Sequence, residues 1–273
     1  MLTSYHVHST HSDGKSPIRE FVEAAIEAGL DELGISDHYV LPPSGEPVVW
    51  SMPLAGLPAY FEDLRAAREF AGNKLTIRYG LEADFDPLAA EDLGEVLRAH
   101  ELDYVIGAVH FLDGFPVDEN AENWDELTQP ERNDMVRFYW DRVGQAARSG
   151  LFDFFAHLDL CKKFGHLPTV DISGEVAAAL DAIAEAGMGV EINTSGLYMP
   201  IAEAYPSRAI LLECRRRGIP VQVNSDAHVP ANLTRGFDDA LRLIADAGYA
   251  ETAVYSARKM SLVALPQGIR QPS

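Results

Sequence analysis

The chain has 273 residues, of which 47% are hydrophobic and 23% charged, so it holds enough apolar material for a core, and we expect a folded globular protein. Its formal net charge of -20 repels nucleic acid and anionic membrane surfaces, and no basic stripe interrupts that charge, so we expect neither as a partner. The length fits two average domains or one α/β barrel, and one barrel is favoured.

Cysteine usage and the start of the chain indicate a cytoplasmic protein. The two cysteines, Cys161 and Cys214, lie in segments that read as buried or helical and do not form a disulfide framework, which fits a reducing cytosol. No basic region followed by a long apolar stretch precedes the first expected strand, and no run approaches the length of a membrane span.

The first short strand opens at Leu2 and brings His6, His8 and Asp13 within a few residues of one another. Successive side chains of a strand point to opposite faces, so His6 and His8 point the same way and can chelate one ion. Ordinary edge strands also carry isolated pairs of this kind, so the pair alone is a weak signal.

A helix is expected next, from Ser16 and Pro17 to Gly29, because the apolar residues between them recur with helical spacing. A second strand, ELGIS, then ends at Asp37 and His38. The Pro- and Gly-rich segment LPPSGEPVVWSMPLAG after it is a long loop of the kind that often covers a site.

Strands and helices alternate along the rest of the chain. Further strands are expected at 75–85, 103–110, 152–157, 189–195 and 219–225. Further helices are expected at 58–72, at 90–100, around 135–143, and at 174–187, 207–218 and 237–247. Seven apolar strands alternating with helices predict a parallel sheet that is covered by helices and closed or nearly closed. An open doubly wound sheet is the alternative, but it would gather ligands at a single switch point.

Six of the seven strands end on residues of metal-ligating type. These candidates are His6, His8, Asp13, His38, Glu82, His110, His157, Asp226 and His228. They are too many for one ion and suit two or three, and imidazole with carboxylate is a ligand set for Zn, Fe or Mn. A carboxylate such as Glu82 can bridge two of these ions. His11, His100 and His166 are read as ordinary core or rim residues.

The motifs HVHSTHSDG, ISDH, GLEADF, GAVH, AHLD and NSDAH follow one another in this order, from His6 to about Phe237. In this the chain resembles the polymerase and histidinol phosphatase (PHP) superfamily of metal-dependent phosphoesterases. The pieces DYVIGAVHFLDG, HLDLCKKFGH and EINTSGLY, together with the length, are most similar to its histidinol-phosphatase branch.

The resemblance implies a single domain over residues 1–273, built as a distorted (β/α)7 barrel with a trinuclear metal centre at the carboxyl ends of its strands. It implies one metal held by His6, His8, Glu82 and Asp226, a second by Glu82, His110 and His157, and a third by Asp13, His38 and His228. In related members the position of Asp13 can be a histidine, and His11 could compete for that place.

The implied activity is hydrolysis of L-histidinol phosphate, a small phosphate ester of histidine biosynthesis. A hydroxide that bridges two ions would attack phosphorus in line, because a metal lowers the pKa of bound water from about 15.7 to about 7. Glu82, Asp226 and His228 are the expected catalytic residues. Asp37 and Asp159 follow or precede ligand histidines closely in sequence, where carboxylates can orient imidazoles.

The metals are expected to bear most of the charge of the substrate phosphate, and Lys162 or Lys163 is expected to add to its binding. Members of the branch often carry Arg where this chain has Tyr198, which can donate one hydrogen bond but offers neither charge nor a bidentate fork. The remaining candidates for substrate contact are Lys162 and Lys163, after the fifth strand, and Arg208 and Arg235.

Other functions remain open at this point. One is a PHP-type phosphoesterase for another small phosphomonoester or a nucleotide. Another is an amidohydrolase, which also begins with a His-x-His strand but commonly bridges its metals through a carboxylated Lys. The acidic charge disfavours a nuclease. A non-catalytic metal-binding module should have lost some of its ligands. The native metal and the oligomeric state are left open.

Overall fold

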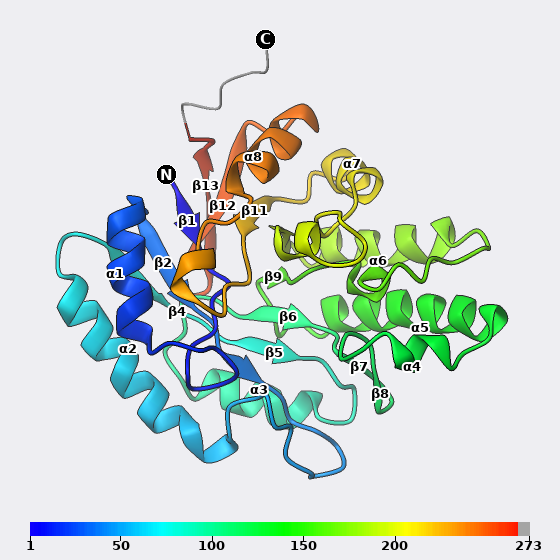
Figure 1. The fold of residues 1–273 in the computed structure, drawn as a ribbon, viewed down its shortest axis with the longest axis horizontal. Helices are drawn as coiled ribbons and strands as arrows, with labels where there is room; N and C mark the ends of the chain where they lie inside the picture. Colours follow the sequence, from blue (N-terminus) through cyan, green and yellow to red (C-terminus); the bar gives the residue numbers. More distant parts are fainter. Residues whose placement is uncertain (267–273) are drawn as a thin grey trace.

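The computed structural model describes residues 1–266; residues 267–273 of the predicted domain lie outside the described part. It is an α/β protein in which strands lie at the centre and helices surround them (Figure 1). Three central strands are β1 (Thr3–Ser4), β2 (Glu32–Ile35) and β4 (Thr76–Tyr79). Six more are β3 (His38–Tyr39), β5 (Glu82–Asp84), β6 (Ile106–Ala108), β9 (Phe154–Phe155), β10 (Gly189–Asn193) and β11 (Val221–Asn224).

These strands form two sheets in which every pair is parallel, as the alternation of strands and helices predicted. The smaller sheet has the order β1-β2-β4 and the larger has the order β11-β10-β9-β6-β5-β3. Two predicted strands are divided between the sheets: the second supplies β2 and then β3, and the third supplies β4 and then β5. The carboxyl-terminal parts of both therefore enter the larger sheet, where His38 pairs with Glu82.

The Tyr104 side chain lies where these two strands divide. Its hydroxyl donates a hydrogen bond to the Tyr5 carbonyl oxygen at 2.6 Å, and its ring passes close to Gly34 and Gly80. A Cβ on either glycine would come within 2.2 Å of Tyr104, so both positions require glycine. The buried ring thus fills the space between the divided strands.

The segment that follows β1 lies between the segments that follow β2 and β11. The Ser36 amide donates to the Val7 carbonyl oxygen at 2.9 Å, and on the other side Val7 forms a parallel bridge with Ala227. The His8 amide donates to the Ala227 carbonyl oxygen at 3.0 Å. This pairing places Asp226 next to the first predicted ligands, although they lie at opposite ends of the sequence.

The predicted helices are present. They are α1 (Ile18–Ala28), α2 (Leu57–Ala71), α3 (Ala90–Arg98), α5 (Gln129–Arg148), α6 (Ser173–Glu185), α7 (Arg208–Arg216) and α8 (Phe237–Asp246), with the short α4 (Glu122–Asp125) before α5. Figure 1 shows α1 and α2 on one side of the strands and α5 and α6 on the other. Within residues 1–266 none of the helices is both long and apolar enough to cross a membrane.

Two hairpins were not predicted. The short one is β7 (Phe111–Leu112) with β8 (Phe115–Pro116), and the long one is β12 (Glu251–Ser256) with β13 (Lys259–Ala264). The long hairpin follows α8, which the sequence analysis took as the last element. Its buried Tyr255 packs against Tyr5, Tyr104 and Phe154, an apolar cluster near the starts of the central strands. The hairpin thus covers the end of the strands opposite to the predicted ligands.

Candidate metal centre

The nine predicted ligands converge at the carboxyl ends of the central strands. Within four overlapping groups, the ligating atoms lie within 4.8 Å of one another. The groups are His8, Asp13, His38 and His228; His6, Glu82 and His157; His6, His8 and Asp226; and His38, Glu82 and His110. Each predicted ligand therefore lies in at least one group, and four of them belong to two.

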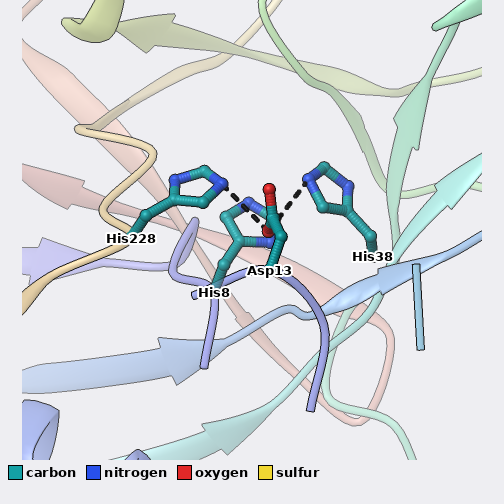
Figure 2. A group of neighbouring side chains, drawn as sticks. All are labelled: His8, Asp13, His38 and His228. Carbon is teal, nitrogen blue, oxygen red and sulfur yellow. Dashed lines mark ion pairs between the residues drawn. The ribbon is translucent and has the colours of Figure 1, made fainter. Parts of the chain in front are cut away.

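Asp13 lies between His228 and His38, beside His8 (Figure 2). Its Oδ1 atom is 3.1 Å from Nε2 of His228 and 3.8 Å from Nε2 of His38. The His8 ring stacks on the rings of both histidines, with centroids 4.0 Å from His38 and 4.4 Å from His228. The structure thus brings together the three residues of the third predicted ligand set, with His8 beside them.

The loop that carries Asp13 is held by Asp37. Asp37 Oδ1 accepts hydrogen bonds from the Ser9 amide (2.8 Å) and the Ser12 hydroxyl (2.6 Å), and Oδ2 accepts from the Ser9 hydroxyl (2.7 Å). A Cβ on Gly14 would lie 2.0 Å from the His8 carbonyl oxygen, so the loop also needs glycine there. The expectation that Asp37 orients an imidazole is therefore wrong, because both of its oxygens are engaged by this loop.

Glu82 lies at the centre of the cluster and faces different histidines with its two oxygens. Its Oε1 is 3.0 Å from Nε2 of His157 and 3.8 Å from Nε2 of His110. Its Oε2 is 2.6 Å from Nδ1 of His38 and 3.2 Å from Nε2 of His6. This is the arrangement that a bridging carboxylate needs.

The segment after β11 supplies the last two candidates. Asp226 Oδ1 is 3.1 Å from Nε2 of His8 and 3.5 Å from Nε2 of His6. Asp226 has a φ of 55°, a left-handed conformation that costs a residue other than glycine roughly 1–3 kcal/mol and tends to occur at functional sites. Nδ1 of His228 lies 3.0 Å from the Asp226 carbonyl oxygen, so this ring can point its Nε2 at Asp13.

Glu191, in the middle of β10, is a site residue that the sequence analysis missed. Its carboxylate is fully buried and lies 2.9 Å from Nδ1 of His6, which leaves Nε2 of that ring facing the cluster. It also accepts hydrogen bonds from the His157 amide (2.8 Å) and from the side-chain amides of Asn193 (2.7 Å) and Asn224 (2.9 Å). The available signal was a lone carboxylate within the apolar strand GVEINTS.

Asp84 contacts Nδ1 of His110, as Glu191 contacts Nδ1 of His6. It accepts hydrogen bonds from the His110 amide at 2.7 Å and from Nδ1 of the ring at 3.0 Å. It stands two positions after Glu82 in β5, so both carboxylates lie on the same face of that strand. Such contacts fix the tautomer and orientation of a ligating imidazole.

The donor set fits metal ions. Several buried atoms of the cluster have no hydrogen-bond partner among the described residues: His6 Nε2, His8 Nδ1 and Nε2, Asp13 Oδ1, His38 Nδ1, Glu82 Oε2 and Asp226 Oδ1. Leaving a buried polar atom without a partner costs about 1–3 kcal/mol, so a cluster of such atoms is unfavourable unless it binds something. Imidazole nitrogens and carboxylate oxygens together are ligands for Zn, Fe or Mn.

Burial and neighbouring charges set the protonation of the cluster. Burial, reinforced by His38 and His228, lowers the pKa of His8 to about 3, so its nitrogens are free to act as ligands. Burial opposes ionisation of Glu82, but the histidines around it outweigh burial and hold the pKa of that carboxyl well below its usual value. The Glu82 carboxyl is therefore held in its ionised form, which is the form that binds a metal ion.

A cavity of about 1080 Å³ opens over the cluster and reaches Asp13, His110 and His228. The Pro- and Gly-rich loop that was expected to cover a site forms one wall, together with the residues after β6. In this wall the Trp50 and Phe111 rings are stacked, with centroids 5.8 Å apart and planes 7° from parallel.

Of the predicted substrate contacts, Lys163 and Arg235 line this cavity, and Lys162, Tyr198 and Arg208 do not. Arg208 is the first residue of α7, and half of the Tyr198 side chain is exposed to solvent.

The prediction that Lys162 contacts the substrate is therefore wrong. Its buried ammonium lies 2.7 Å from Oε2 of Glu203 and 3.0 Å from Oδ2 of Asp159, and it donates to the Ala204 carbonyl oxygen at 2.9 Å. Asp159 also accepts a hydrogen bond from the Ser207 amide at 2.9 Å, so its suggested role in orienting an imidazole is wrong too. Both residues join the loop after β9 to the segment before α7.

The three histidines that were assigned no site role are engaged elsewhere. His11 contacts Asp63 at 2.8 Å and His166 contacts Asp125 at 2.9 Å. Nδ1 of His100 lies 2.9 Å from the Val96 carbonyl oxygen in the last turn of α3. His11 therefore does not compete with Asp13.

Comparison with known proteins gives the family. A family model described as the PHP domain matches residues 4–195. A probable histidinol-phosphatase of Deinococcus radiodurans is 40% identical over 263 residues, covering 95% of this chain and 98% of that protein. The histidinol-phosphatase of Bacillus subtilis is 27% identical, covering 81% of this chain and 90% of that protein.

A solved structure has the same fold. It is the histidinol phosphate phosphatase of Lactococcus lactis subsp. lactis in complex with zinc, L-histidinol and phosphate. Its TM-score is 0.81 at 24% sequence identity, covering 95% of this chain and 98% of that one. The chain thus belongs to the PHP domain family and, within it, to the histidinol-phosphatase branch.

Proposed function

We propose that this protein is a metal-dependent phosphomonoesterase that hydrolyses L-histidinol phosphate to L-histidinol and phosphate, a step of histidine biosynthesis. The observation that carries the proposal is the convergence of nine ligand side chains around Glu82 at the floor of one cavity. The 40% identity to a probable histidinol-phosphatase supports this substrate in particular.

The proposal includes two or three divalent transition metals, Zn, Fe or Mn, held by the nine ligands. When bound, such ions supply positive charge to the phosphate oxygens and acidify a water molecule. Glu82, Asp226 and His228 are the proposed catalytic residues, because their side chains are shared between groups or border the cavity. Glu191 and Asp84 hold His6 and His110 in the tautomers that point Nε2 into the cluster.

The cavity wall favours this substrate over a nucleotide. Asp86, Asp118 and Glu119 line it, and the stacked rings of Trp50 and Phe111 lie nearby. Carboxylates and aromatic faces attract a cationic amino alcohol that carries an imidazole, whereas they repel the additional phosphates of a nucleotide. A small phosphomonoester with a cationic organic part is therefore the better fit.

The same proposal takes the central strands as a distorted (β/α)7 barrel within one domain over residues 1–273. The parallel bridge between Val7 and Ala227 supports a closed arrangement, because it joins the first strand segment to the last. Active sites of β/α barrels lie at the carboxyl ends of the strands, where these ligands gather.

We expect the purified protein to hold two or three transition-metal ions per chain, because nine ligands in four overlapping groups exceed what one ion can use. Elemental analysis of protein from cells grown in metal-sufficient medium measures the ratio, and anomalous scattering locates the ions. One ion per chain, or none, would contradict the multinuclear site.

Phosphate release is expected to be fastest from L-histidinol phosphate. A screen should compare it with other small phosphomonoesters and with a dinucleotide, using protein of measured metal content. Protein stripped by a chelator should be inactive and should recover when metal is restored. If the loaded enzyme ignores L-histidinol phosphate and cleaves another ester well, the substrate assignment fails, although the metal-dependent chemistry stands.

A further inference from the structure

Arg235 brings a positive charge to the wall of an acidic cavity. Among the described residues, the only cations that line the cavity are Lys163 and Arg235. Lys163 is already engaged, because its ammonium lies 3.0 Å from Oδ2 of Asp118 and donates to the carbonyl oxygen of the same residue at 2.7 Å. Arg235 forms no ion pair within residues 1–266, and its buried Nε has no hydrogen-bond partner there.

The Arg235 side chain is nevertheless held in place. Its guanidinium carbon lies 3.9 Å from the centroid of the Tyr198 ring, a cation–π contact. Tyr198 belongs to the short helix η3 (Ser195–Tyr198), which follows β10, whereas Arg235 lies beyond β11. Two loops of the cavity rim therefore cooperate to place one guanidinium.

The backbone of this segment is held as well. The Thr194 hydroxyl donates to the Arg235 carbonyl oxygen at 2.6 Å. The next residue, Gly236, has a φ of 78°, and a Cβ there would lie 3.0 Å from Cβ of Thr194 and 3.1 Å from Cδ1 of Leu197. Glycine thus permits the close approach that brings Arg235 to the Tyr198 ring.

We propose that Arg235 binds the phosphate of the substrate and that Tyr198 is a positioning residue that holds the guanidinium ready. A guanidinium offers parallel donors that match two oxygens of a phosphate, and the buried Nε of Arg235 has no hydrogen-bond partner within residues 1–266. Asp226 and His228 precede it in the same segment and border the same cavity. This inference rests on the proposed phosphomonoesterase function and names the residue that recognises the phosphoryl group.

The test measures binding of inorganic phosphate and of L-histidinol separately, by calorimetry on the metal-loaded protein. In Arg235→Met, the Kd for inorganic phosphate should rise about 10- to 100-fold, because charge-assisted hydrogen bonds are lost. The Kd for L-histidinol, which has no phosphate, should stay within about twofold, and the metal content should not change. KM for L-histidinol phosphate should rise with the phosphate Kd.

Tyr198 variants test the positioning role. Tyr198→Ala should raise the phosphate Kd by a few-fold, roughly the value of one cation–π contact, and Tyr198→Phe should restore most of the affinity, because the ring face is kept. Arg19→Met, which removes an exposed arginine from α1, is the matched control and should bind phosphate normally.

Wild-type affinity for phosphate in Arg235→Met overturns the proposal, and so does an equal loss of L-histidinol binding. If that variant loses its metals or its fold, the Kd values for inorganic phosphate and L-histidinol are measured on Arg235→Gln instead, and the same outcomes decide. A wild-type protein that hydrolyses no phosphomonoester would refute the proposed function instead, and the binding of inorganic phosphate would still decide the role of Arg235.

Discussion

Replacing Glu82 with Gln is expected to lower kcat by at least about a thousandfold, or ~4 kcal/mol of transition-state stabilisation. The change hardly alters the volume of the side chain, but it removes the negative charge of the carboxylate. The two oxygens of that carboxylate lie 3.0 Å from Nε2 of His157 and 2.6 Å from Nδ1 of His38. An amide also offers one acceptor in place of two, so it cannot bridge two ions. Metal content per chain should therefore fall together with the rate.

Three measurements on the same preparation separate these effects. Steady-state phosphate release gives kcat, elemental analysis gives the metal content, and circular dichroism with thermal unfolding reports the fold. Glu62→Gln, an exposed position on α2, is the matched control and should behave as the wild type in all three. A Glu82→Gln protein with normal rate and metal content would remove Glu82 from the site.

Glu191→Gln is expected to weaken metal binding, or activity at limiting metal, by about 10- to 100-fold, although Glu191 is not itself a proposed ligand. The carboxylate accepts hydrogen bonds from His6 and also from the His157 amide and from Asn193 and Asn224. With an amide, one of these donors would face another donor, and the His6 ring would lose the acceptor that fixes its tautomer.

Competition with a chelator of known affinity measures the metal affinity of this variant. Asp84→Asn removes the corresponding acceptor from His110 and should shift the affinity in the same direction. Thermal unfolding of metal-stripped samples should show a further loss of about 1–3 kcal/mol for Glu191→Gln, because a buried donor loses its acceptor. Unchanged metal affinity in both variants would show that these carboxylates act only on the fold.

The convergence of the nine candidate ligands could be predicted from the sequence because all of them occupy the same kind of position. Each stands at or just after the end of an apolar strand, and parallel strands bring their carboxyl ends to the same place. His110 and His157, for example, are 47 positions apart in number, but β6 and β9 are neighbours in the sheet. The pattern of types and positions therefore sufficed to name the residues that meet.

Which side chains of distant segments contact each other could not be predicted from the sequence. Nothing in CKKF distinguishes Lys162 from Lys163, yet one is engaged by Glu203, 41 positions away, and the other faces the cavity. Glu191 was missed for the same reason, because its role depends on side chains from other strands. Arg235 was one of several candidates for substrate contact, but its contact with Tyr198 could not be predicted. The hairpin of β12 and β13 was not predicted, because its antiparallel strands do not continue the alternation of strands and helices and β13 is mostly exposed.

The contact between the first and last strand segments has a consequence for how the protein is made. The Tyr5 amide bonds to the side chain of Asn224, 219 positions later, and Ala227 pairs with Val7 immediately beyond. During synthesis His6 and His8 emerge from the ribosome long before Asp226 and His228, because most of the described chain lies between them. Until those two residues emerge, the early histidines remain without these partners, so the complete centre cannot assemble before the segment after β11 has left the ribosome.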